Sequence, residues 1–428
     1  MKFAALPKPQ QGKTVNVISW FKQGVIRWLG SCLLIVGYIA TADAAVQNIT
    51  AVFRPDPANP LNNKFVNTTP ESGLCAWHPP MFPMCKALGI FTIRTEDILF
   101  TSRRPIPANH ENERDGFMFR VPSSWRDMQV VHTETGAVEK VQMRIAGIGN
   151  RFDVLGNPPG TDAWGPRWST WPYAPAPCVS TNYSAGNINY MLWFWVVPEG
   201  TGTCSRKALM DVPAMKTVTF EYAYEIRNPN PLTMSTGQYI GSMFYTIGPG
   251  MDFDFGDVMI PNDNTLTFNV TLDVQHALKI EIPHGGNRVV LEPQGGWQSW
   301  LNNNSQPARL FRDQTFNISA SSRFKMKLEC GQEMGDTCGL RNAANHQVPM
   351  QISVSLPNGL TRADGSPVNR QPLLLSGAGT ELFQPGFYVD RKPGTLHFEV
   401  GREDTKEMLK HGGSQYSGTA TVVWDSEV

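Results

Sequence analysis

The stretch Ser414-Gln415-Tyr416-Ser417-Gly418-Thr419-Ala420-Thr421-Val422-Val423-Trp424 decides the fold that we expect for this chain. Its alternation predicts a β-strand with Tyr416, Ala420, Val422 and Trp424 on one side. A near copy lies 177 residues upstream, at 237–246, where Gln, Tyr and Gly recur at the same spacing. Two similar strands, each at the end of a long β-rich segment, indicate two related domains in tandem. The alternative is that so short a match arises by chance.

The residues after the two copies differ. Ile247-Gly248-Pro249-Gly250 comes after the first copy as a turn, and a new series of alternating runs begins. Only 425–428 come after the second copy. A β-sandwich that ends on such a strand resembles the pilin domain of a chaperone–usher fimbrial subunit. The resemblance implies that 249–428 form an incomplete immunoglobulin-like sandwich, which another protein completes by donor-strand complementation.

An open groove would then run beside the terminal strand. The resemblance implies that its edge is formed by Tyr416, Gly418, Ala420, Val422 and Trp424. Two details depart from the better-known fimbrial subunits. Many of those end with a penultimate Tyr, and many carry a disulfide from their first strand to a later one. Here Trp424 is followed by four residues, and the nearest cysteines would close a short local loop.

Residues 1–44 have the features of a secretory signal peptide. Five basic residues lie between positions 2 and 27, an apolar run covers 28–40, and Ala42-Asp43-Ala44 has small residues at the cleavage positions. The apolar run is short for a bilayer span, although a retained membrane anchor is the alternative. We therefore expect export through the periplasm to the fimbrial tip on the cell surface.

Composition and patterning predict an all-β protein. The 33 prolines and 38 glycines fall mostly between short alternating runs. The runs at 266–274 and 278–282 alternate strictly, which is typical of antiparallel sandwiches. We expect two tandem β-sandwich domains, at 45–248 and 249–428, with the second beginning at 253–258. No helix of convincing length is expected in 250–428.

The charge balance excludes one class of partner. Without 1–44, the chain keeps 32 basic residues (37 − 5) and 36 acidic residues (37 − 1), a formal charge of −4. This balance argues against a nucleic-acid partner.

The cysteines predict disulfides in an oxidising compartment. Three pairs of near neighbours suggest the bridges 75–85, 178–204 and 330–338, although six cysteines allow 15 pairings. The residues concerned are Cys75, Cys85, Cys178, Cys204, Cys330 and Cys338. None has the spacing of a zinc knuckle or a redox site.

Half of the ten tryptophans beyond residue 44 lie in 161–195. Trp193 and Trp195 belong to the continuous apolar run 190–197, which predicts a buried strand. Three others lie in a loop rich in Pro and Gly, where aromatic rings could offer flat faces to sugars. The ligand site that we expect there comprises Trp164, Arg167, Trp168, Trp171 and Tyr173. The alternative is a hydrophobic lid folded over the sandwich.

Two further stretches extend the resemblance into the first domain. The sequence 67–75 (NTTPESGLC), which comes after FRPDPANP at 53–60, resembles the start of exported fimbrial tip proteins. Arg227 ends a strand, as does a receptor-contacting arginine in the tip adhesins of colonisation-factor fimbriae. Those adhesins carry adjacent basic residues at that point, whereas Asn228 comes next here.

Catalytic signatures are lacking in the sequence. It contains no HExxH, GxSxG or P-loop motif, and its eight histidines have no metal-ligand spacing. Asp252 and Asp254 could serve a glycosidase, but alternating positions at a domain start predict that both face solvent. We therefore expect no enzymatic activity, no cofactor and no metal.

Two functions compete for this chain. Residues 45–53 are too few for both a donor arm and an opening strand, so we expect a subunit at the end of a fibre. An extra domain there predicts a tip adhesin that attaches bacteria to a glycan or glycoprotein receptor of a host or surface. The alternative is a non-adhesive tip subunit that initiates assembly. The partners implied are a periplasmic fimbrial chaperone, an outer-membrane usher and the adjacent fimbrial subunit.

Overall fold

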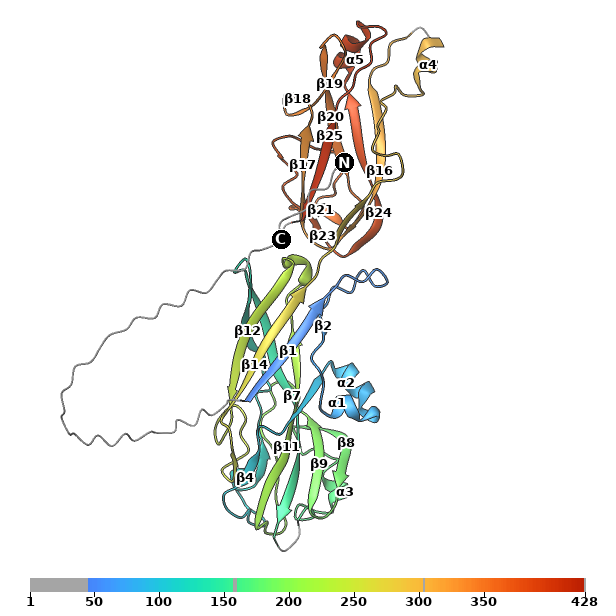
Figure 1. Ribbon diagram of the computed structural model, residues 1–428. Helices are drawn as coiled ribbons and strands as arrows, with labels where there is room; N and C mark the ends of the chain where they lie inside the picture. The colour runs from blue at the N-terminus through green and yellow to red at the C-terminus, as the bar shows by residue number, and fades with distance from the viewer. Residues whose placement is uncertain (1–44, 157–159, 303–304, 427–428) are drawn as a thin grey trace, which may run out of the picture. The chain divides into compact units, whose positions relative to one another are not determined.

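The computed structural model describes residues 45–156, 160–302 and 305–426. Within them the chain is almost entirely β and forms two sets of sheets, each around its own apolar core (Figure 1). The all-β prediction and the division into two β units are confirmed. The predicted signal peptide, 1–44, lies outside the described residues.

The first set is built on one twelve-stranded sheet. Its main path runs in the order β13-β4-β11-β7-β6-β12-β14-β1-β2, with β3 on β11, β9 on β7 and β8 on β9. A two-stranded sheet of β5 and β10 accompanies it. The strands are β1 (Ala45–Phe53), β2 (Val66–Asn67), β3 (Phe91–Thr95), β4 (Phe100–Ser102), β5 (Phe117–Phe119), β6 (Arg126–His132), β7 (Val138–Leu155), β8 (Val179–Gly186), β9 (Tyr190–Val196), β10 (Cys204–Arg206), β11 (Ala214–Arg227), β12 (Gly237–Thr246), β13 (Met259–Pro261) and β14 (Thr265–Val274).

The second set consists of a seven-stranded and a four-stranded sheet. The seven-stranded sheet has the order β15-β16-β24-β20-β19-β18, with β22 on β20, and the four-stranded sheet has the order β21-β23-β17-β25. The strands are β15 (Leu278–Glu281), β16 (Leu310–Ala320), β17 (Phe324–Cys330), β18 (Glu333–Met334), β19 (Thr337–Arg341), β20 (Gln347–Ser355), β21 (Leu360–Arg362), β22 (Gln371–Pro372), β23 (Phe383–Pro385), β24 (Val389–Val400) and β25 (Ala420–Ser426).

Helices are short in the described residues. The α-helices are α1 (Leu74–Trp77), α2 (Phe82–Leu88), α3 (Arg167–Thr170), α4 (Trp297–Asn302) and α5 (Arg402–Leu409), and the 3₁₀ turns are η1 (Pro79–Met81), η2 (Glu113–Asp115) and η3 (Pro231–Thr233). The expectation of no helix in 250–428 is wrong for α4 and α5. The sequence gives little signal for α5 because the helix carries the ion pairs Glu403–Lys406 and Glu407–Lys410. Its fully buried residue is the polar Thr405, and Met408 is its one apolar residue packed against the second core.

We expected the boundary between the two domains at residue 248, but the strand pairing places the end of the first set of sheets after Val274. β14 pairs along its length with β12 on one side and runs parallel to β1 on the other. Its apolar side chains lie in the core of the first set. The segment 253–258 is not a strand that opens the second domain, because Phe253, Phe255 and Val258 are buried in that same core. Residues 249–274 therefore belong to the first set of sheets.

Candidate functional site

The edge strand β25 leaves one side of the second core incompletely covered. β25 pairs antiparallel with β17, so that Met326 lies opposite Trp424 and Leu328 lies opposite Val422. On β17 these core-facing residues are fully buried, at 1% and 3% exposure. Their partners on β25 are only half-buried, as is Ala420, although they pack against the same core. The ring of Trp424 lies 5.0 Å from that of Phe316, which belongs to the floor of this region.

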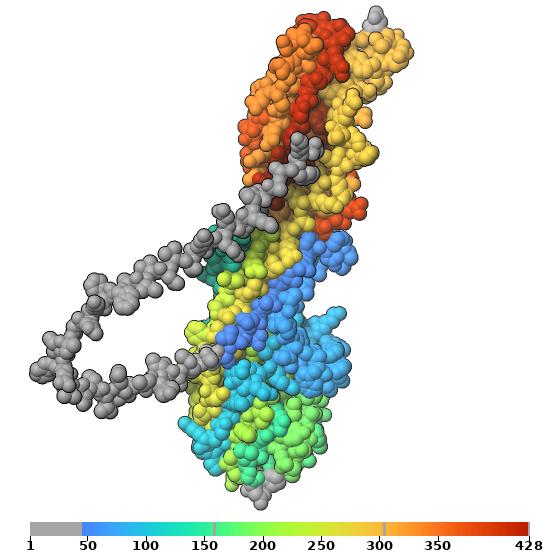
Figure 2. All heavy atoms as spheres, in the orientation of Figure 1, coloured from blue at the N-terminus to red at the C-terminus, as the bar shows by residue number. Residues whose placement is uncertain are grey.

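A second sheet edge, formed by β15 and the residues that come after it up to Leu291, also carries half-buried apolar side chains. β15 is the last strand of the seven-stranded sheet, and the chain continues from it to Glu292, which bridges to Phe311 of β16. Its apolar residues also pack on the second core while remaining half-buried: Leu278, Ile280, Val289 and Leu291. In Figure 2 the red C-terminal segment lies between the orange strands and the yellow segment that contains this edge. Two sheet edges thus place half-buried apolar side chains on the same core.

In the first set of sheets, the position next to the strand that carries the Gln-Tyr-x-Gly motif is occupied by another strand. There β14 lies between β12 and β1, antiparallel to the former and parallel to the latter. Every second residue of β14 enters the core, and all five are at most 2% exposed: Leu266, Phe268, Val270, Leu272 and Val274. β12 carries the first copy of the Gln-Tyr-x-Gly motif, and the second copy leads into β25. Among the described residues, β25 has no neighbour that corresponds to β14.

The shared glycine of the motif has a packing reason in both copies. A Cβ on Gly241 would lie 2.3 Å from the Gln129 carbonyl oxygen, and a Cβ on Gly418 would lie 2.5 Å from that of Gly339. Gly418 is therefore pressed against β19, where Ser417 and Arg341 also exchange backbone hydrogen bonds. The structure thus gives Gly418, which we expected at the groove edge, a close approach of two backbones. Tyr416 was also expected at the groove edge. Its hydroxyl oxygen lies 2.8 Å from His346 Nδ1.

Two residues of the expected ligand site are buried. Trp164 and Trp171 are 4% and 1% exposed. Their rings contact one another and both contact Phe152, and the Trp171 indole Nε1 donates to the Thr161 carbonyl. Their prediction as ligand contacts is wrong, because the loop turns these rings into the core beneath α3. For them the alternative of a hydrophobic lid is correct.

The other members of the expected site lie at the surface. Trp168 and Tyr173 are 54% and 51% exposed. Arg167 lies beside the Trp168 ring and forms an ion pair with Asp162, with 2.6 Å between Nη1 and Oδ2. Asp162, Arg167 and Trp168 line a shallow hollow together with Gly165 and Pro166. The structure therefore brings an aromatic face and a charge pair together in this loop.

Arg227 lies in a different group of residues. Its guanidinium stacks on the Trp125 ring at 3.8 Å from the centroid, and its charge faces Glu199 at 3.9 Å. The buried Arg144 lies on the same ring at 5.6 Å and pairs with Glu225 at 2.8 Å. Arg227 thus does not join the residues around Trp168 in a single hollow. Sequence reasoning missed Trp125, although an aromatic residue near a strand start carries little signal on its own.

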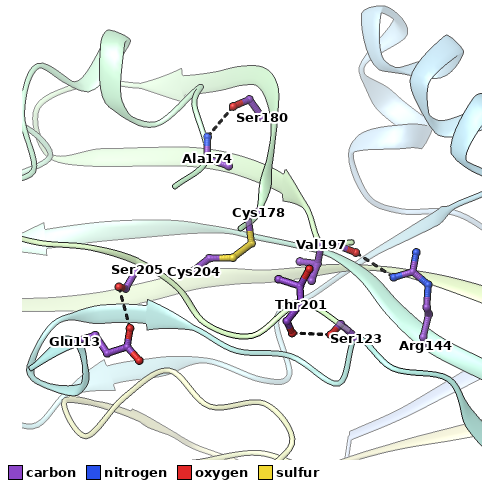
Figure 3. The surroundings of a disulfide bond; sticks show 10 residues. All are labelled: Glu113, Ser123, Arg144, Ala174, Cys178, Ser180, Val197, Thr201, Cys204 and Ser205. Carbon is purple, nitrogen blue, oxygen red and sulfur yellow. Dashed lines mark hydrogen bonds between the residues drawn. A yellow bond between two sulfur atoms is a disulfide. The ribbon is translucent and has the colours of Figure 1, made fainter. Parts of the chain in front are cut away.

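The disulfide Cys178–Cys204 stabilises the region that presents this loop (Figure 3). Around it, Ser180 accepts from the Ala174 backbone amide and Ser205 donates to Glu113. The other bridges join Cys75 with Cys85 and Cys330 with Cys338. These three bridges are the pairs of near neighbours expected from the sequence.

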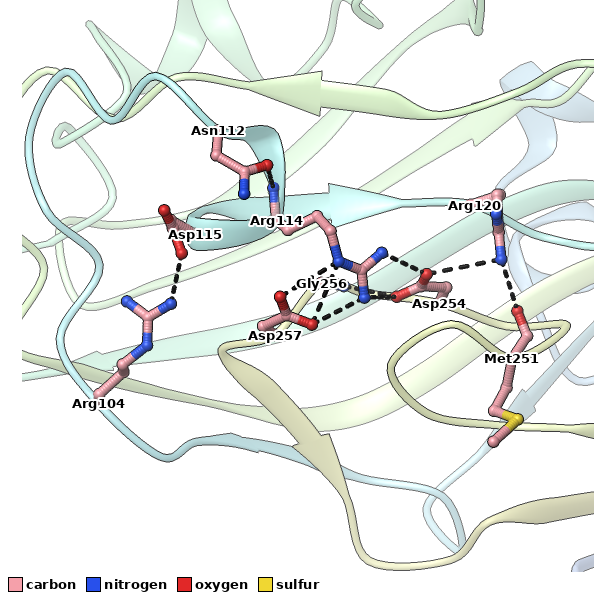
Figure 4. Close-up of polar contacts among 9 residues, drawn as sticks. All are labelled: Arg104, Asn112, Arg114, Asp115, Arg120, Met251, Asp254, Gly256 and Asp257. Atoms are coloured by element: carbon pink, nitrogen blue, oxygen red, sulfur yellow. Dashed lines mark hydrogen bonds and ion pairs between the residues drawn. The ribbon is translucent and has the colours of Figure 1, made fainter.

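An ion-pair network around the buried Asp254 anchors the segment after β12 (Figure 4). Arg114 reaches Asp254 at 2.7 Å and Asp257 at 2.8 Å, and Arg120 lies 3.6 Å from Asp254. Hydrogen bonds to Asp257 and Asp254 raise the pKa of Arg114, and the bond from Arg114 lowers the pKa of Asp257. Asp254 is completely buried, so the prediction that it faces solvent is wrong. Asp252 instead accepts from the backbone amide of Thr246.

The described ranges contain neither a metal-ligand cluster nor a membrane-spanning helix. No three His, Cys, Asp or Glu side chains there come together as metal ligands. Nor does any helix in that part of the chain have the length and apolar character to cross a bilayer.

No family model and no curated protein matches the sequence. Among solved structures, the chain is similar to CfaE, the adhesive subunit of CFA/I fimbria of enterotoxigenic Escherichia coli, at 12% identity and a TM-score of 0.25, over 90% of this chain and 95% of that one. It is also similar to a chain of a chaperone–tip adhesin complex of CFA/I fimbriae, at 11% identity and 0.24, over 90% and 97%. A third is a chain of the CsuC–CsuE chaperone–tip adhesion subunit pre-assembly complex from archaic Csu pili of Acinetobacter baumannii, at 10% and 0.21, over 89% and 98%.

Proposed function

We propose that the chain is a fimbrial tip adhesin whose second set of sheets accepts a donor strand from the adjacent subunit. The observation that carries this proposal is the contrast between β17 and β25. Met326 and Leu328 are buried, whereas Trp424 and Val422 directly opposite remain half-covered. An extended segment laid along β25 would bury this row and satisfy the open strand edge.

We infer the length and the apolar pattern of the donor strand from β14. It is a strand of about ten residues with an apolar side chain at every second position, since that is the strand that fills the corresponding place beside β12. A periplasmic chaperone would supply such a strand before assembly, and the adjacent subunit would supply it after passage through an outer-membrane usher. β1 supports a place at the end of the fibre, because 45–53 are already paired in the first sheet and are not a free arm.

The receptor surface that we propose is the exposed part of the expected ligand site: Arg167, Trp168 and Tyr173. Trp168 offers an aromatic face, and the Asp162–Arg167 pair beside it offers donors and acceptors for hydroxyl groups. This combination suits a glycan or glycoprotein. Arg227 on Trp125 is a second, separate candidate contact, because more than half of its side chain is exposed.

One observation favours the alternative, a non-adhesive tip subunit that initiates assembly. The burial of Trp164 and Trp171 leaves Trp168 and Tyr173 as the exposed aromatic residues of the loop.

A glycan array probed with the full chain, held in complex with its chaperone, distinguishes the two functions. We expect the unchanged chain to bind a glycan on the array and the Trp168→Ala variant to lose that binding. The control variant Val138→Ala, changed at an exposed apolar residue of β7, should bind as the unchanged chain does. Equal signals from the two variants would refute this receptor surface.

A further inference from the structure

The short helix α4 presents an apolar face to solvent. Trp297 and Leu301 are 40% and 70% exposed, and their spacing places them on the same side of the helix. The helix is held in place at its base, because Gly295 and Gly296 form a turn with left-handed backbone angles and the Trp300 indole donates to the Gln294 carbonyl at 2.8 Å. In Figure 2 the gold segment that contains α4 stands out from the second set of sheets.

The strand registers show at which end of the groove α4 lies. Leu310, which begins β16, pairs with Val400 at the end of β24, and Ala320 pairs with Val389 at the other end. The chain passes from Ala320 directly into β17, whose first residue pairs with Ser426. Ala420 therefore lies toward the Leu310 end. α4 precedes Leu310 by a few residues, so it stands at that end as well.

The direction of the donor strand can be inferred from the first set of sheets. β14 runs antiparallel to β12 and parallel to β1, and the corresponding strands here are β25 and the edge that begins with β15. A donor with this direction enters beside Ser426 and leaves beside Ala420. If the donor is the N-terminal arm of a subunit, the folded body of that subunit begins where the arm leaves, next to α4.

We propose that the Trp297–Leu301 face of α4 is a docking surface for the folded body of the subunit whose arm fills the groove. The inference rests on the proposed function and adds a second contact to it. An apolar pair at the exit of the arm would lose water against that body, which slows dissociation without changing the arm itself. The groove would then bind the donor arm of the subunit, and α4 would bind the folded body of the same subunit.

The test uses photo-crosslinking residues in the full chain within assembled fibres. A crosslinker in place of Thr421, an exposed residue of β25, should capture the arm of a subunit. A crosslinker in place of Leu301 should capture the same subunit at residues after its arm, and one at Val138 should capture neither. Adducts of position 301 with any other protein, or none while position 421 captures the arm, would overturn the docking surface. No arm adduct from position 421 would overturn the proposed function and this inference with it.

A variant supplies a second measure. Trp297→Ser combined with Leu301→Ser should release the adjacent subunit from isolated fibres about tenfold faster in mild denaturant, since two large apolar contacts are lost. The matched control is Leu61→Ser, which removes an exposed apolar side chain from the loop between β1 and β2. Equal release rates for the double variant and the control would overturn the docking surface.

Discussion

Supplying the missing strand within the chain should close the second core. We would append a flexible linker and a copy of 265–274 after Val428, because β14 is the strand that fills the corresponding place in the first set. The copy should dock beside β25. We expect the unextended chain to aggregate through its open strand edge and the extended chain to be a soluble monomer. Protection of the amides of 415–426 against hydrogen exchange should rise, since β25 ceases to be an edge.

The magnitude can be set by comparing two substitutions in the appended copy. Phe268 points into the core in β14 at 0% exposure, whereas Asn269 is exposed. Phe268→Ala in the copy should lower the free energy of opening β25 by about 3 to 5 kcal/mol, which is the usual cost of emptying a buried Phe site. Asn269→Ala in the copy should change it by less than about 0.5 kcal/mol. Linker, length and ordering cost are the same in both variants.

The assay is native-state hydrogen exchange of 415–426 by mass spectrometry, with size-exclusion chromatography as the readout of the monomer. Two results would refute the reasoning. Equal protection in the extended and unextended chains, without a chaperone, would mean that the second core is already complete. Equal effects of the two substitutions would mean that the copy does not alternate between core and solvent as β14 does.

Further predictions test four single residues. Trp168→Ala should weaken adhesion about tenfold at an unchanged melting temperature, whereas Trp171→Ala should lower stability by about 3 to 5 kcal/mol because Trp171 is buried in the core. Tyr183→Phe should leave stability at neutral pH unchanged or about 1 kcal/mol higher, as measured by denaturant unfolding, since the buried hydroxyl has no hydrogen-bond partner among the described residues. Burial raises the pKa of Tyr183 to about 12, so the stability from its protonated form is complete below pH about 10 and is lost as the pH rises toward 12. The Phe variant should lose less stability across that pH window. Gly418→Ala should lower the melting temperature, at a cost of about 1 to 3 kcal/mol, because its Cβ would meet the Gly339 carbonyl; an unchanged melting curve would show that β19 can move aside.

Local patterns in the sequence were sufficient for several features. Alternation located the strand at 266–274 and the second half of the predicted terminal strand, since β25 begins only at Ala420 and ends at Ser426. The continuous apolar run marked Trp193 and Trp195 as buried. Near-neighbour spacing identified the three disulfides. These features depend on residues close together in the chain, and the period of a strand or the length of a small loop can be counted directly.

Other features depended on partners far away in the chain. Alternation identified β14 as a strand but not its neighbours, which are β12 and the distant β1. Pro and Gly around Trp164 and Trp171 indicated a loop, yet the packing of Phe152 and of Trp193 and Trp195 beneath it decided that both rings are buried.

The sequence by itself determined that this protein is all-β, that it repeats one strand motif, and that its cysteines bridge locally, because propensity, period and spacing are local properties. Only the tertiary structure decided which copy of the motif is interior and which is an edge. β12 has β14 and β6 on its two sides, whereas β25 has β17 on one side only among the described residues. The physical reason is that strand pairing and burial join residues far apart in the chain, and no local pattern records which distant strand will cover an apolar row.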